Sequence, residues 1–198
     1  MKAEHRLLNP LLGYHGCDAT VAERVLSGRE GLLPSDNDYD WLGPGIYFWI
    51  GSPERALDWA REQCKRDKLS TPAVIGALIH PARCLNLTDY GALDEVFAAY
   101  KHLVKLHSVA SMAGHAPDAL PENAVIKHGV SLIRRLDCAV IRTLHQLCEE
   151  ANYPPYDAVF GVFEEDAPLY PGAGFKRKTH VQIAVRNMEA VVGYFRPA

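Results

Sequence analysis

The chain has 198 residues, of which 48% are hydrophobic and 23% charged, the balance of an ordinary globular protein. A chain of this length buries roughly 70% of its unfolded surface, which excludes intrinsic disorder and small disulfide scaffolds. The net charge of −3 provides no strong field toward nucleic acid or membrane. The longest apolar run, Ala73–Ile79, is far shorter than the ~20 residues that span a bilayer.

The cysteines and the N-terminal residues indicate the compartment. Five cysteines are an odd count, and none of them forms a CxxC pair, which favours reduced thiols. The segment Met1–Arg6 carries charges of both signs and lacks an apolar signal core. No repeat or flexible linker divides the chain. We therefore expect a cytoplasmic, single-domain protein over residues 1–198 with no membrane partner.

The first third of the chain is expected to alternate strands and helices. Thr20 and Glu23 have capping-box spacing, and Ser52-Pro53-Glu54 supplies an N-cap, a first-turn proline and an acid. The expected elements are a strand over Leu11–His15, a helix from Thr20, a loop over Pro34–Gly45, a strand over Ile46–Ile50 and a helix to about Lys68.

The remainder favours helices enclosed by strands. Strands are expected over Ala73–His80, Arg83–Leu87, Asp157–Phe163, Thr179–Arg186 and Ala190–Phe195, and helices over Ala92–Leu106 and Val130–Glu150. This order predicts an α+β domain in which residues from about 89 to 152 form a helical insertion.

Three segments carry residues suited to chemistry. Tyr14-His15-Gly16-Cys17 ends the first strand, Gly43-Pro44-Gly45-Ile46-Tyr47-Phe48 leads into a helix, and the strand Thr179–Arg186 follows late in the chain. In identity and order, the first two segments resemble the ADP-ribosyltransferase superfamily, in the branch shared by diphtheria toxin and the poly(ADP-ribose) polymerases. The resemblance covers Leu11 to Ala60 and matches the late strand in position, but not in its acid.

The resemblance implies a fold and a reaction. The fold would be a split mixed or antiparallel sheet, and the reaction would cleave the nicotinamide–ribose bond of NAD and transfer ADP-ribose to an acceptor. NAD would be a consumed substrate, and no metal is expected. Gly16 would let the backbone approach the carboxamide, Tyr47 would stack on the nicotinamide ring, and His15 would bind ribose hydroxyls.

The NAD-binding residues implied are Tyr14, His15, Gly16, Gly45, Ile46, Tyr47 and, in the loop near adenosine, Ser35 and Asn37. We expect Trp41, Trp49 and Trp59 to be packing residues.

Alternation along the late strand presents Gln182 where the family carries its catalytic glutamate. An amide can bind a ribose hydroxyl, but it cannot stabilise a cation by charge or take up a proton. Three interpretations stand. Gln182 substitutes for the acid, Glu164 or Glu165 supplies the carboxylate, or the domain binds NAD or ADP-ribose without turnover, as a sensor.

The segment before the late strand is the candidate acceptor loop, over Leu169–Thr179. Its residues Tyr170, Phe175, Lys176, Arg177 and Lys178 combine aromatic rings with positive charge, which suits an anionic or nucleic-acid acceptor. The sequence leaves three classes of acceptor open: a protein, a nucleic acid or a small molecule. It also leaves open whether the protein acts as a toxin, with a cognate inhibitor or antitoxin as partner, as a defence factor or as a housekeeping modifier. A third alternative is an RNA 2′-phosphotransferase, which shares the fold.

Overall fold

A computed structural model describes residues 9–115, 119–127 and 130–198, without the side chains of residues 125–132. The α-helices in this part of the chain are α1 (Ala19–Leu26), α2 (Pro53–Cys64), α3 (Tyr90–Met112) and α4 (Arg135–Glu150). The strands are β1 (Leu11–Asp18), β2 (Ile46–Ile50), β3 (Pro72–Ile79), β4 (Cys84–Asn86), β5 (Asn123–Lys127), β6 (Val130–Arg134), β7 (Ala158–Phe163), β8 (His180–Val185) and β9 (Val191–Phe195). A short 3₁₀ turn over Met188–Ala190 precedes β9.

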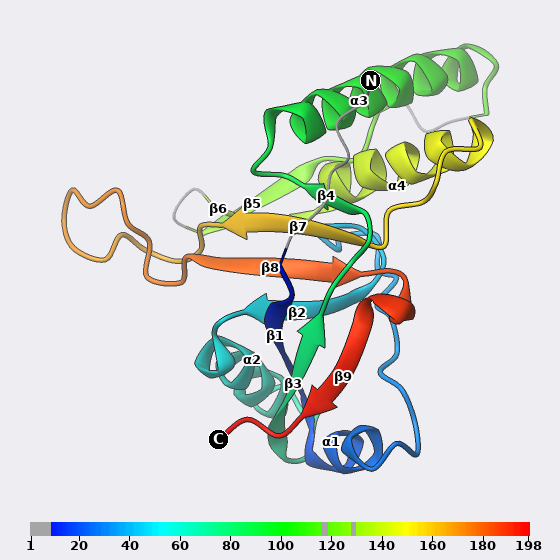
Figure 1. Ribbon diagram of the computed structural model, residues 1–198. Coiled ribbons are helices and arrows are strands. Elements are labelled where there is room, and N and C mark those ends of the chain that lie inside the picture. The colour runs from blue at the N-terminus through cyan, green and yellow to red at the C-terminus, as the bar shows by residue number, and fades with distance from the viewer. Residues whose placement is uncertain (1–8, 116–118, 128–129) are drawn as a thin grey trace.

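A seven-stranded sheet in the order β4-β7-β8-β2-β1-β3-β9 forms the centre of the molecule (Figure 1). Its pairs are antiparallel except β4 with β7, so the α+β prediction is confirmed. Helices α3 and α4 lie beyond the β4–β7 end of the sheet, and α1 and α2 lie toward the β1–β3 end (Figure 1). The hairpin β5–β6 forms a separate two-stranded sheet beside α4.

The sheet forks between β1 and β2. These strands pair only at Gly13 with Ile50 and at Tyr14 with Trp49. Beyond Tyr14, β1 pairs with β3 alone, whereas β2 pairs with β8 alone from Ile46 to Phe48. The two halves therefore diverge at His15, and the backbone there borders an opening in the sheet.

The helix starts partly differ from the sequence predictions. Asp18, not Thr20, caps α1: its carboxylate accepts from the Thr20 backbone N–H at 2.9 Å, and the Thr20 hydroxyl donates to the same oxygen. Backbone N–H groups of Ser70 and Thr71 also donate to Asp18. Four such bonds to one carboxylate explain why Asp18 displaces the capping box. Helix α2 begins at Pro53 as predicted but ends at Cys64, short of Lys68.

The insertion contains more than helices. Strand β2 and the late strand β8 match their predictions closely, but Val130–Arg134 is strand β6, so the prediction of a helix from Val130 is wrong at that end. Helix α4 begins at Arg135 instead, and α3 continues past Leu106 to Met112. Val130–Arg134 pairs across the hairpin with β5, and this partner outweighs its local helical pattern.

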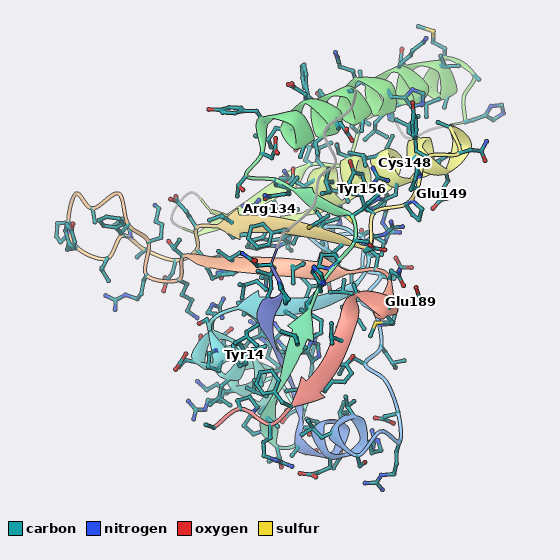
Figure 2. The ribbon with its side chains drawn as sticks, viewed as in Figure 1. Tyr14, Arg134, Cys148, Glu149, Tyr156 and Glu189 are labelled. Carbon is teal, nitrogen blue, oxygen red and sulfur yellow. The ribbon has the colours of Figure 1, made fainter. Side chains whose placement is uncertain are left out.

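The sheet separates two apolar cores. Phe48, Ile75 and Ile183 belong to the core shared with α1, while Tyr156, Val159 and Ile141 belong to the core under α3 and α4. Tyr156 is fully buried beside α4, and its hydroxyl donates to Glu95 of α3 at 2.7 Å (Figure 2). The insertion is thus fastened to the sheet by packing and by hydrogen bonding.

A buried histidine makes stability depend on pH. Desolvation and the charge of Arg186 lower the pKa of His145 in α4 to about 3, below the ~6.5 of an unfolded histidine. Between these values the unfolded chain binds the additional proton, so the free energy of unfolding should fall by about 1.4 kcal/mol per pH unit as the pH decreases below 6.5. Urea denaturation of His145→Gln at pH 7 and pH 5 should show a shallower dependence than the unsubstituted protein. His80→Gln, at an exposed site, is the control, and equal slopes in all three proteins would contradict the prediction.

Candidate functional site

A pocket of about 720 Å³ opens at the fork of the sheet. The residues around it come from β1, β2, β8, helix α2, the loop before β2 and the hairpin end next to α4. They are His15, Leu33, Ser35, Tyr39, Asp40, Trp41, Gly45, Ile46, Tyr47, Trp49, Arg55, Trp59, Glu62, Gln63, Arg66, Lys68, Ile133, Arg135, Glu165 and Gln182. His15, Tyr47 and Gln182, which are distant in the sequence, therefore border one space.

His15 bridges the two arms of the fork. Its Nδ1 lies 2.8 Å from the Tyr47 carbonyl oxygen. Because a carbonyl only accepts, Nδ1 carries the proton and donates it, which leaves Nε2 as an acceptor. Burial lowers the pKa of His15 further than the Tyr47 carbonyl raises it, so the ring is neutral near pH 7. A neutral imidazole with a free acceptor nitrogen can take a hydrogen bond from a ligand hydroxyl.

Tyr47 offers its ring to the pocket, but its hydroxyl is fully engaged. The hydroxyl donates to the Gly43 carbonyl at 2.7 Å and accepts from the Leu42 N–H at 2.9 Å. Burial raises the pKa of this phenol far above its usual value, so it does not ionise. The ring face remains available for stacking, whereas acid–base chemistry by the hydroxyl does not fit.

Gln182 is 8% exposed and lies opposite Trp49 on β2 and Gly161 on β7. His180 is buried two residues before it on the same face, among the rings of Trp41, Trp49 and Phe163. The His180 Nδ1 donates to the Lys178 carbonyl at 2.7 Å, and desolvation is the main reason that its pKa is lowered. A neutral, buried histidine is thus the neighbour of Gln182 on the same face of β8.

The two glutamates that follow β7 have different surroundings. Glu165 borders the pocket and forms a 2.6 Å ion pair with Arg55 of α2, in which both side chains are largely buried. Glu164 is exposed and is absent from the pocket lining. Arg55 also lies over the Trp49 ring, 5.7 Å from its centroid. Glu165 therefore supplies a fixed negative charge at the pocket that Gln182 also lines, whereas Glu164 does not.

The predicted acceptor loop projects from the sheet between β7 and β8 (Figure 1). Its base is fixed, because the Lys178 ammonium contacts Asp58 and Glu62 of α2 at 2.9 Å each. The rings of Tyr170 and Phe175 are exposed farther out. Arg177 is exposed and Lys176 partly so, and none of the five predicted loop residues lines the pocket itself.

The predicted NAD-binding residues divide into two groups. Ser35, Gly45 and Ile46 line the pocket with His15 and Tyr47. Tyr14 instead packs edge-on against Phe195 of β9, on the far side of β1 (Figure 2). Asn37 does not line the pocket, but its side chain donates to the Ser35 hydroxyl at 2.8 Å.

Gly16 stands against helix α2 without lining the pocket. A methyl group on its Cα would lie 2.3 Å from the Ala56 carbonyl oxygen and 3.2 Å from the Trp59 ring. Only a glycine permits β1 and α2 to approach so closely. Gly16 therefore sets the position of Trp59 at the pocket wall.

The aromatic and polar wall formed by α2 was not predicted from the sequence. Trp41, Trp49 and Trp59, predicted as packing residues, all border the pocket. The residues that α2 and the turn after it contribute are Arg55, Trp59, Glu62, Gln63, Arg66 and Lys68. A spacing of three or four residues places Arg55, Trp59 and Glu62 on one face of the helix, and this was the signal that could have identified them.

The insertion holds the loop that forms the other wall. Arg135 pairs with Asp38 at 2.8 Å and Arg142 with Asp36 at 2.6 Å, both from α4 to the loop before β2. Arg134 places its guanidinium 4.4 Å from the centroid of the Trp41 ring, a position on the α4 side of the sheet (Figure 2). The insertion thus shapes the pocket that the fork opens.

In the described ranges, no three histidine, cysteine or carboxylate side chains are placed to hold a metal ion. The helices of that same part of the chain include none with the length and apolar run needed to cross a bilayer.

The chain is similar to an uncharacterized protein of Methanocaldococcus jannaschii. The two are 34% identical over 86 residues, which covers 38% of this chain and 36% of the relative. The matched part is thus about a third of the relative's length. No protein family and no solved structure matches this chain.

Replacing Gly16 by alanine should destabilise the protein and disturb the pocket wall. The added methyl group meets backbone, which cannot rotate away, so we expect a loss of about 1–3 kcal/mol in the free energy of unfolding. Gly31→Ala is the matched control, because nothing lies within 4 Å of its added methyl group. Chemical denaturation of both variants measures the difference, and equal stability of the two would contradict this packing.

Proposed function

We propose that this protein is a mono-ADP-ribosyltransferase that cleaves NAD between nicotinamide and ribose and transfers one ADP-ribose unit to an acceptor. The observation that carries the proposal is the meeting of His15, Tyr47 and Gln182 at one pocket. The volume of about 720 Å³ lies within the roughly 300–1,000 Å³ of typical ligand sites. The fork between β1 and β2 supports an ADP-ribosyltransferase-like, split-sheet core.

In this proposal the ring-binding end of the pocket lies between Tyr47 and Trp59. Both side chains border the space, and Trp59 is held against the Gly16 backbone. Two aromatic faces can hold a planar pyridinium ring and exclude water around it. Nicotinamide would occupy this place, and Gly16 would act through the position of Trp59, since it does not line the pocket itself.

The ribose would be oriented by His15 and Gln182. The neutral His15 has Nε2 as an acceptor for a ribose hydroxyl, since Nδ1 is committed to Tyr47. Gln182 offers a carboxamide from β8, held in place by its neighbours. Correct orientation of a reacting sugar accounts for large rate factors, because it replaces the entropy that a free encounter would lose.

The positive charge that develops on the ribose would be stabilised by Glu165. Departure of neutral nicotinamide leaves cationic character on the sugar, which a nearby carboxylate favours. Gln182 carries no charge, whereas Glu165 borders the same pocket and is fixed by Arg55. We therefore assign the charge to Glu165 and the hydroxyl contact to Gln182, which combines two of the interpretations drawn from the sequence.

A second candidate is a sensor that binds NAD or ADP-ribose without turnover. The observation favouring it is the ion pair with Arg55, which engages the Glu165 carboxylate in the state described here. A sensor should bind NAD saturably in calorimetry and release no nicotinamide. In that case Gln182→Glu, which places a carboxylate on β8, should produce measurable hydrolysis.

Nicotinamide release from NAD tests the transferase proposal. We expect His15→Ala and Gln182→Ala each to lower the rate on the order of 100-fold, because the ribose loses its orientation. His80→Ala removes an exposed histidine and should leave the rate unchanged. Assays include cell extract as the source of acceptor. No release above the His15→Ala background would defeat the enzyme proposal, and saturable binding would then support the sensor.

Two adjacent glutamates test the assignment of the charge. Glu165→Gln should reduce kcat on the order of 100-fold with little change in KM for NAD, because it removes charge needed in the transition state. Glu164→Gln, one residue away and exposed, should match the unsubstituted enzyme. Circular dichroism and thermal unfolding establish that both variants are folded. Full activity of Glu165→Gln would remove Glu165 from the mechanism and return the role to Gln182 alone.

A further inference from the structure

Helix α3 carries an apolar stripe that is exposed in the part of the chain that the structure describes. Its members recur at intervals of three and four residues along the helix, and they are Tyr90, Leu93, Phe97, Tyr100 and Val104. Tyr90 is 89% exposed and Phe97 is 58% exposed. Phe97 and Tyr100 stack on each other, with ring centroids 6.4 Å apart. Alternating spacing of this kind is the pattern by which one helix pairs with another.

The neighbouring face of α3 joins the rest of the protein. Ala92 and Ala99 are buried, and Val96 and Leu103 pack with them against the core that includes α4. Helix α3 is the outermost element on that side of the molecule (Figure 1). A helix with one apolar face inside and a second outside is suited to a partner on the outer face.

The charges beside the stripe indicate what that partner is. Asp94 and Lys101 flank the same edge of the stripe, two turns apart, and the Lys101 ammonium lies 4.9 Å from the Phe97 ring centroid. When two copies of α3 run antiparallel around a two-fold axis near Phe97, Asp94 of each copy faces Lys101 of the other. A parallel pair would instead bring like charges to the same level. The charges of Asp94 and Lys101 therefore match those of a second copy when the two helices run antiparallel, and not when they run parallel.

The apolar residues match in the same register. Phe97 lies opposite the partner's Tyr100, and Leu93 lies opposite the partner's Val104, while the reciprocal contacts follow from the symmetry. Each of these contacts thus joins an apolar side chain of one helix to an apolar side chain of the other. One register therefore satisfies both the apolar stripe and the charged edge.

We propose that this protein forms a two-fold symmetric dimer through antiparallel pairing of α3 with α3 of a second copy. With roughly 200 Å² for each aromatic side chain, the exposed parts of the stripe offer about 500 Å² per copy. This is less than the ~800 Å² per partner of a standard interface, which predicts a reversible dimer with a micromolar dissociation constant. The pocket lies at the fork of the sheet, away from α3, so dimerisation and NAD chemistry are separate properties.

Sedimentation of the full chain between about 2 and 200 μM tests the dimer. We expect the mean mass to rise from monomer toward dimer with concentration, and Phe97→Lys to remain monomeric throughout. Val192→Lys, a matched change of an exposed apolar residue on β9, should dimerise normally. Thermal unfolding confirms that each variant is folded.

A charge exchange tests the orientation. Asp94→Lys should raise the dissociation constant at least about 10-fold by placing like charges together. Combining Asp94→Lys with Lys101→Asp restores opposite charges and should return it to within about 3-fold of the original value. A monomer at every concentration, a dimer that survives Phe97→Lys, or a double variant as weak as the single one would each overturn the proposal. Loss of thermal stability in Phe97→Lys with no dimer at any concentration would show that the stripe packs within its own chain.

Discussion

The hydrogen bond from His15 to the Tyr47 carbonyl is the contact on which the pocket depends. It joins β1 and β2 where they have ceased to pair as strands, so it limits how far the fork can open. The bond also fixes the proton on Nδ1 and leaves Nε2 as an acceptor. Since the acceptor is a main-chain oxygen, the tautomer does not depend on the side chain at position 47. The same hydrogen bond thus sets both the orientation of the His15 ring and the nitrogen that carries its proton.

Around this bond the pocket walls are held by charges that the protein pairs internally. Glu165 is fixed by Arg55, and Asp36 and Asp38 are fixed by Arg142 and Arg135. The first pair ties the start of the β7–β8 loop to α2, and the others tie the loop before β2 to α4. These contacts join elements far apart in sequence, and partial burial protects the Glu165 pair from screening better than the exposed ones. Salt should therefore weaken the ion pair on the α2 side of the pocket less than the two pairs on the α4 side.

Local patterns sufficed for much of the fold, but not for the residues that complete the site. Strand β2 was predictable because Ile46–Ile50 is a short run of β-branched and aromatic residues between two glycines, which is a local signal. The Asp18 cap was not, since two of its donors come from Ser70 and Thr71. His15 and Tyr47 were found through a sequence resemblance. Trp59 was missed, because an aromatic residue in a core and one at a pocket wall have the same helical periodicity. The choice between Glu164 and Glu165 needed the direction of the chain after β7, which tertiary contacts set.

The attachment of Lys178 to Asp58 and Glu62 has a consequence for how this protein can diverge. The salt bridges hold the β7–β8 connection at its root, while Tyr170 and Phe175 stand beyond them in solvent. Insertions, deletions or exchanges at the tip are then mechanically isolated from β8 and from Gln182. Under the proposed transferase function, replacing those few residues would change the acceptor and leave the pocket unchanged. The root and the tip would consequently be expected to evolve at different rates.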